Sequence, residues 1–287
     1  MKNIIIGRSN LSVTIFIPVD CSNNCNFCTS KNEYCEQEYN LKKVIKSIKK
    51  LNKNEDIKSY VITGGEPFAD LKVLNKILKA IEFGKDVYVN TTLPTNKYTE
   101  EELITFINQS RISAINLSRH TPNIEKDKLM FSDYIASDNI LNKINKPIKI
   151  NCFVTNNTDL TAIINRWYKY KNVYLTFRAD YRRITKETLR KLDDEIVLKI
   201  LNIKNVKHLY HGGCDVCFDM TFKYADDFIF SYHRGLEHSS ISFGDNYVVI
   251  NDIIIWINGK CYYDWDKCKK TQLKIKNGNI FIKNIEE

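Results

Sequence analysis

Three cysteines lie within eight residues of one another in the stretch "DCSNNCNFCTSK". They are Cys21, Cys25 and Cys28, and their C-x3-C-x2-C spacing gathers three thiols in one loop. Three thiolates can bind a cubane [4Fe–4S] cluster and leave its fourth iron without a protein ligand, whereas structural zinc sites and electron-transfer clusters usually take four protein ligands. The spacing therefore predicts a metal centre with one open position, with a zinc loop as the alternative.

A second motif, "VITGGEPFAD", ends the next predicted strand and contains Gly64, Gly65 and Glu66. Glycine has no Cβ, so its backbone can approach a ligand closely. On these two motifs the sequence resembles the radical S-adenosylmethionine (SAM) superfamily, whose signature is C-x3-C-x-Φ-C with an aromatic residue at Φ. Phe27 occupies that position, and the glycines with Glu66 match the family's GGE motif. The resemblance covers roughly residues 10–200.

The resemblance implies a shared chemistry. In the family, the open iron chelates SAM, an electron breaks its S–C5′ bond, and the 5′-deoxyadenosyl radical abstracts hydrogen from a substrate. The GGE backbone and the carboxylate of Glu66 are then expected to hold the methionyl ammonium, and flavodoxin or ferredoxin is the expected reductant. Thr91, Thr92, Ser118 and Arg178 follow predicted strands where related enzymes contact the SAM carboxylate and ribose; loop capping is their alternative role.

Three functions remain open at this level. The first is hydrogen abstraction from a peptide or small metabolite. The second is modification of a nucleotide or RNA, which the basic charge favours but which has no recognisable RNA-binding module behind it. The third is a non-enzymatic iron–sulfur or zinc protein that does not bind SAM. The sequence does not indicate the fate of a substrate radical or whether SAM is consumed.

Four more cysteines lie near the C-terminus: Cys214 and Cys217 in "HGGCDVC", then Cys261 and Cys268 in "GKCYYDWDKC". A C-x2-C pair and a second pair brought back by hairpins can supply four metal ligands. We expect a second [4Fe–4S] cluster of the auxiliary kind that many radical SAM enzymes carry, with structural zinc as the alternative. The spacing departs from that of the usual auxiliary domain.

Other candidate residues have weaker support. Arg119 and His120 in "SRHTPN" are interpreted as substrate contacts or, slightly favoured, as solvated loop residues. Cys152 lies in an apolar strand, where a buried inert thiol is the default. Cys35 is expected to be exposed. Either thiol could instead donate hydrogen to a substrate radical.

The elements that must position these residues alternate along the chain. Strands are predicted at 12–19, 58–63, 86–91, 112–118, 148–155 and 173–178, with amphipathic helical segments between them. Asn40 is a predicted N-cap for a helix whose outer face carries five exposed lysines, and Thr99 with Glu102 forms a predicted capping box. Six β–α units predict an α/β fold, a partial (β/α)6 TIM-like barrel with its functional groups at the carboxyl ends of the strands.

From about residue 205 the pattern changes to short apolar runs separated by Asp245–Asn246, Asn258–Gly259 and Asn277–Gly278, which is typical of hairpins. We therefore expect a radical SAM barrel over residues 1–204 and a small, mostly antiparallel, cysteine-containing region over 205–287 that closes the pocket.

Composition narrows the class of protein. The 287 residues are 43% hydrophobic, enough for one sizeable core. No apolar run is long enough to span a membrane, and the N-terminus lacks a signal sequence, so a cytoplasmic protein is expected. The net charge of +9 comes largely from lysine. A solvated lysine surface is the simpler explanation, and an anionic partner is the alternative.

Overall fold

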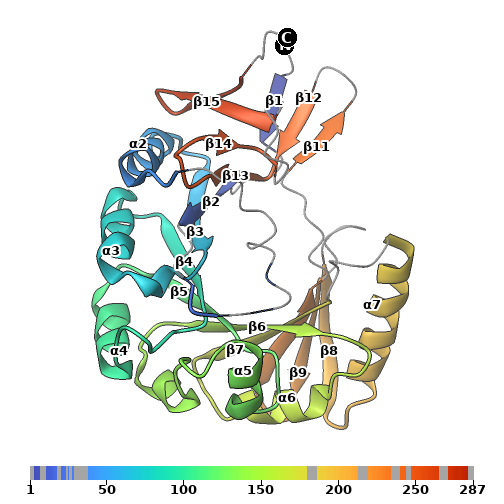
Figure 1. The fold of residues 1–287 in the computed structure, drawn as a ribbon. Helices are drawn as coiled ribbons and strands as arrows, with labels where there is room; N and C mark the ends of the chain where they lie inside the picture. Colours follow the sequence, from blue (N-terminus) through green and yellow to red (C-terminus); the bar gives the residue numbers. More distant parts are fainter. Residues whose placement is uncertain are drawn as a thin grey trace. The chain divides into compact units, whose positions relative to one another are not determined.

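The computed structural model describes residues 3–6, 11–17, 21–23, 25, 28, 38–179, 186–212, 219–233, 240–243, 247–264 and 271–283 (Figure 1). The chain forms two compact units. The first comprises Met1–Ser113 with Glu237–Glu287, and the second comprises Ala114–Leu236.

The first unit is built on the parallel strands β2 (Leu11–Ile17), β3 (Ile57–Gly64) and β4 (Asp86–Thr91). On the other side of β2 lies β13 (Asp252–Ile255), also parallel to it. The sheet continues with the antiparallel strands β14 (Cys261–Tyr262), β15 (Gln272–Lys276) and β16 (Asn279–Ile282). A separate small sheet has the order β1 (Asn3–Ile6), β12 (Tyr247–Ile250) and β11 (Ser240–Phe243).

Three helices cover one face of the strands of the first unit: α2 (Leu41–Leu51), α3 (Leu71–Ala80) and α4 (Glu100–Gln109) (Figure 1). Each begins at a side-chain cap. The predicted cap of α2 is confirmed because Asn40 accepts a hydrogen bond from the backbone of Lys43. The predicted capping box of α4 is confirmed by reciprocal bonds between Thr99 and Glu102. Helix α2 buries Val44, Ile48 and Leu51, as its apolar spacing predicts.

The second unit contains the parallel strands β5 (Ala114–Ser118), β6 (Ile148–Val154) and β7 (Val173–Ala179). Strand β10 (Phe228–His233) runs parallel to β7, and β9 (Asp219–Tyr224) and β8 (Val206–Gly212) follow it in antiparallel pairs. The helices of this unit are α5 (Ile124–Met130), α6 (Leu160–Trp167) and α7 (Lys186–Leu201), with the short 3-10 helix η2 (Asp138–Lys143).

The α/β class with a core of parallel strands, as a partial barrel requires, is confirmed, and all six predicted strands form. Antiparallel hairpins are confirmed beyond residue 205, and Asn277 and Gly278 have the positive φ angles of 51° and 83° that a tight hairpin turn needs. The predicted turn at Asp245–Asn246 lies outside the described residues.

Two strands of the C-terminal region depart from the mostly antiparallel pattern. Strands β10 and β13 run parallel to β7 and β2 and extend the parallel part of each unit. Their short apolar sequences do not reveal a parallel partner far away in the chain, because parallel pairing depends on tertiary contacts. The division at residue 204 stays a prediction. None of the helices in the described part of the chain has the length and apolar character needed to cross a membrane.

Candidate functional site

The three motif cysteines follow β2 directly. Cys21, Cys25 and Cys28 are each partly buried, and the backbone N–H of Cys28 donates to the carbonyl of Cys25 over 3.2 Å. Burial raises the pKa of the Cys21 thiol to about 11, and the nearby Glu66 and Cys28 also raise it. The thiol of Cys21 is therefore protonated at neutral pH until a metal replaces the proton. Phe27 lies outside the described residues.

Glu66 ends the second motif and is buried, with 3% of its surface exposed. One carboxylate oxygen, Oε1, accepts from the Thr91 hydroxyl at 2.6 Å and from the Phe68 N–H at 3.1 Å. The other, Oε2, accepts from both the N–H and the hydroxyl of Thr92 at 2.8 Å. Burial raises the pKa of Glu66, and these four bonds oppose that shift. The carboxylate therefore ties the end of β3 to the end of β4.

Asn23 joins the cysteine loop to this carboxylate. Its side chain is buried, and its Nδ2 donates to the Thr92 hydroxyl oxygen at 2.8 Å. The same hydroxyl donates to Glu66, so a continuous chain of hydrogen bonds runs from the loop between Cys21 and Cys25 to the GGE motif. No sequence signal marks Asn23 as part of the site, because asparagine is common in this chain and its partner lies 69 residues away.

Gly64 lets the two motifs lie together. Its φ is +124°, a backbone conformation that side chains disfavour, and its register partner on β2 is Ile17. A Cβ at this position would lie 2.4 Å from the Ile17 carbonyl oxygen. Only glycine therefore allows β3 to end against the last residue of β2, just before the cysteine loop.

This donor set fits an iron–sulfur cluster. Three partly buried thiols lie on one short loop, and a hydrogen-bonded network holds that loop against the GGE motif. Across the described residues, no three His, Cys, Asp or Glu side chains are arranged around a single metal ion. A cluster does not require that arrangement, because each thiolate binds a different iron atom.

Ser118 and Arg178 belong to the second unit, at the carboxyl ends of β5 and β7. Both are partly buried, and the Ser118 carbonyl accepts from the Arg119 guanidinium at 2.8 Å. A role for either residue in SAM binding stays a prediction.

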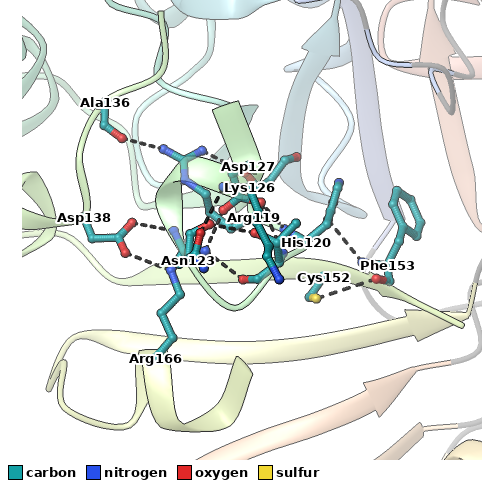
Figure 2. A network of polar contacts seen from close by, with 12 residues as sticks. Arg119, His120, Asn123, Lys126, Asp127, Ala136, Asp138, Cys152, Phe153 and Arg166 are labelled. Atoms are coloured by element: carbon teal, nitrogen blue, oxygen red, sulfur yellow. Dashed lines mark hydrogen bonds and ion pairs between the residues drawn. The ribbon is translucent and has the colours of Figure 1, made fainter. Parts of the chain in front are cut away.

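The interpretation of Arg119 and His120 as solvated loop residues is wrong, because they expose only 1% and 7% of their surfaces. Figure 2 shows the polar network that contains them. Arg119 donates to the Ala136 carbonyl at 2.9 Å, and His120 Nδ1 accepts from the Phe153 N–H at 3.2 Å. This bond makes Nδ1 the acceptor, so the neutral ring carries its proton on Nε2.

A buried ion-pair network fixes the loop after β5 (Figure 2). Asp127 accepts from the backbone N–H groups of His120 and Thr121, and its other oxygen accepts from Arg166 at 2.6 Å. Arg166 also donates twice to Asp138, at 2.8 Å each. These three charged residues have no marked sequence spacing, and only the fold brings them together.

The structure describes only two of the six cysteines beyond the first loop, Cys152 and Cys261. Cys261 is buried on β14, and burial raises its pKa to about 11. Cys214, Cys217 and Cys268 lie outside the described residues, so the predicted second metal site stays a prediction. Cys152 is fully buried in β6, as expected of an inert core thiol, and burial raises its pKa. Cys35 also lies outside the described residues.

Known structures resemble this chain in fold. It matches SuiB of Streptococcus suis bound to SAM with a TM-score of 0.60 and 14% identity, over 92% of this chain and 62% of SuiB. SuiB bound to its precursor peptide SuiA matches with a TM-score of 0.57 and 14% identity, over 88% of this chain and 58% of SuiB. anSMEcpe with bound SAM matches with a TM-score of 0.58 and 14% identity, over 94% of this chain and 78% of anSMEcpe. This chain thus spans about three fifths of the length of SuiB.

Among curated proteins, none matches this chain. The family model of the radical SAM superfamily matches residues 15–154, which include the cysteine loop, the GGE motif and strands β3 to β6. This match identifies residues 15–154 as a radical SAM domain, and the solved structures show that the chain shares their fold.

Proposed function

We propose that Cys21, Cys25 and Cys28 hold a [4Fe–4S] cluster at which SAM is reductively cleaved, and that the resulting radical abstracts hydrogen from a substrate. The observation that carries this proposal is the hydrogen-bonded path from the cysteine loop through Asn23 and Thr92 to Glu66. When bound, the cluster would supply the electron for cleavage. The chain's own residues would bind and orient SAM and the substrate, and they would exclude water from the site.

Glu66 has a positioning role in this proposal. A carboxylate offers about four lone-pair sites, and Glu66 already accepts four hydrogen bonds from its own chain. Its carboxylate can accept from the methionyl ammonium of SAM only by releasing or sharing one of these bonds. Glu66 therefore acts mainly by holding Thr91 and Thr92 in place, and the backbone of the GGE motif is left to contact the ammonium.

A peptide is the substrate class that we favour over a small metabolite. The fold is shared with SuiB, which has been seen with a precursor peptide, and with anSMEcpe, which has been seen with a peptide. At 14% and 15% identity these likenesses support only an analogy. Ser118 and Arg178 are proposed contacts for SAM, and a flavodoxin or ferredoxin is the proposed reductant.

We further propose that Cys214, Cys217, Cys261 and Cys268 bind a second metal centre, a [4Fe–4S] cluster or zinc. Counting iron and zinc on anaerobically prepared protein separates these forms. About eight irons per chain indicate two cubane clusters, and about four irons with one zinc indicate a structural zinc site.

The central experiment measures 5′-deoxyadenosine formed from SAM by reconstituted, dithionite-reduced protein. We expect product from the native chain and from Cys217→Ala, and none from Cys25→Ala, which lacks a cluster ligand. Circular dichroism of each variant checks that it is folded. No 5′-deoxyadenosine from a native protein that carries its full iron content would refute the proposal and favour a non-enzymatic role.

A further inference from the structure

A groove lined by lysines runs along α2 and the C-terminal strands of the first unit. It consists of two adjoining hollows of about 530 Å³ and about 970 Å³, which share Lys50, Ile275 and Lys276. Helix α2 and the turn after it contribute Lys42, Lys46, Lys49, Lys50 and Lys53. Four more lysines come from the C-terminal strands and the residues that flank them: Lys260, Lys274, Lys276 and Lys283. We call this feature the lysine groove.

The described lining of the lysine groove is positively charged and contains no carboxylate. Neither hollow has an aspartate or glutamate in its lining. Among the described residues, the ion-paired lysines Lys85, Lys128 and Lys223 lie outside the groove. Within the described residues, the lining of the lysine groove therefore carries positive charge without an acidic partner.

The lysines that helix α2 contributes to the groove repel one another. Lys46 faces Lys42 and Lys50 at four-residue spacing and Lys49 at three, and like charges at these spacings repel each other. The first turn of α2 contains no acidic residue that would favour the helix dipole. The neighbouring α3 carries three lysines at the same spacings, but they lie outside the groove, and Asp70 caps this helix.

We propose that the lysine groove binds an acidic, extended segment of polypeptide. Its positive charge complements glutamate and aspartate side chains. The exposed Phe281, together with Ile275 and Ile282, adds apolar contacts for the side chains between them. The 11-residue helix α2 is about 16 Å long, the span of about five residues of extended chain.

The lining favours a polypeptide over a nucleic acid. It contains no arginine, the side chain that recognises phosphate with two parallel hydrogen bonds. Its single aromatic residue, Phe281, is too little for a stacking platform of the kind that single-stranded nucleic acids bind. This inference does not depend on the identity of the radical reaction or of its substrate.

The test measures binding of a fluorescein-labelled peptide of alternating glutamate and leucine to the full reconstituted protein by fluorescence anisotropy. The same peptide with glutamine in place of glutamate is the uncharged comparison. We expect the glutamate peptide to bind at least about tenfold more tightly than the glutamine peptide at low salt. Raising the ionic strength to about 1 M should abolish the difference, because the Debye length falls to about 3 Å.

Two variants with equal charge loss locate the site. Lys46→Gln, Lys49→Gln and Lys50→Gln together remove three exposed charges from the groove. Lys72→Gln, Lys76→Gln and Lys79→Gln together remove three exposed charges from α3. We expect the groove variant to bind the glutamate peptide about tenfold more weakly and the α3 variant to stay within about twofold of the native protein.

Stability and cleavage provide independent readouts. The groove variant should melt close to the temperature of the native protein. Relief of the repulsion along α2 is opposed by the loss of Lys49 and Lys50, which lie in its last turn and favour the helix dipole. Both variants should form 5′-deoxyadenosine like the native protein, so a failure here is separate from a failure of the proposed function. Lys49→Glu provides a single-site check and should weaken binding in the same direction.

Three outcomes would overturn the proposal. Equal losses in the groove and α3 variants would show that only net charge matters. Equal binding of the glutamate and glutamine peptides would remove the electrostatic basis. The third outcome is that the native protein binds a single-stranded RNA but binds the peptide only weakly, and that the groove variant loses the RNA binding. This outcome would assign the lysine groove to nucleic acid instead.

Discussion

Replacing Gly64 with alanine tests the tight junction between the two motifs. A Cβ at this position would lie 2.4 Å from the carbonyl oxygen and 2.8 Å from the nitrogen of Ile17, and both are backbone atoms that a rotamer change cannot move. Gly84 provides a matched control because its φ is also positive, at +88°, while nothing lies within 4 Å of its Cβ position. The two variants therefore share backbone strain and differ in steric overlap.

The expected magnitudes follow from this difference. A side chain at positive φ costs about 1–3 kcal/mol at either position, and overlap with a packed backbone adds about 1–3 kcal/mol at Gly64 alone. We expect Gly64→Ala to lower the free energy of unfolding by about 1–3 kcal/mol more than Gly84→Ala does. Since the overlap also moves β2 just before the cysteine loop, Gly64→Ala should bind less iron.

Urea denaturation followed by circular dichroism measures the stability of both variants, and iron analysis after reconstitution measures the cluster. The reasoning is refuted if Gly64→Ala is as stable as Gly84→Ala. Reduced iron binding by both variants would also refute it, because Gly84 lies far along the chain from the cysteine loop and has an open surface around it.

Three further predictions concern single groups that are buried or partly buried. Glu66→Gln should lower stability by about 2–4 kcal/mol in urea denaturation, because the amide NH2 meets the donor N–H of either Phe68 or Thr92; unchanged stability would show that these bonds are weak. Cys152 is fully buried and its pKa is raised, so it should resist iodoacetamide until the protein unfolds; mass spectrometry detects the adduct, and rapid labelling of the native protein would contradict its burial. Burial, with the nearby positive charge of Arg178, lowers the pKa of Lys149, so the native state binds fewer protons than the unfolded state between the lowered and the ordinary pKa. Stability should therefore rise with pH across that window, and Lys149→Met should remove this rise in alkaline denaturation series; identical pH slopes would contradict the shift.

Features that depend on residues close together in the chain could be predicted from the sequence, and features that depend on distant residues could not. The caps at Asn40 and Thr99 were predictable because a cap depends on a side chain and a backbone group three residues away. The positions of β2, β3 and β4 were predictable from apolar runs bounded by polar residues. The sequence could not predict that Arg119 and His120 are buried, because their partners Ala136 and Phe153 are distant in the chain.

The sequence by itself determined the cysteine spacing, the GGE motif and the alternation of strands and helices, because each depends on neighbouring residues. Only the tertiary structure decided the partners of Glu66, the link through Asn23, and the gathering of the groove lysines from α2 and the C-terminal strands. The physical reason is that hydrogen bonds and charge act over a few ångströms of space, and the fold alone sets which distant residues come that close.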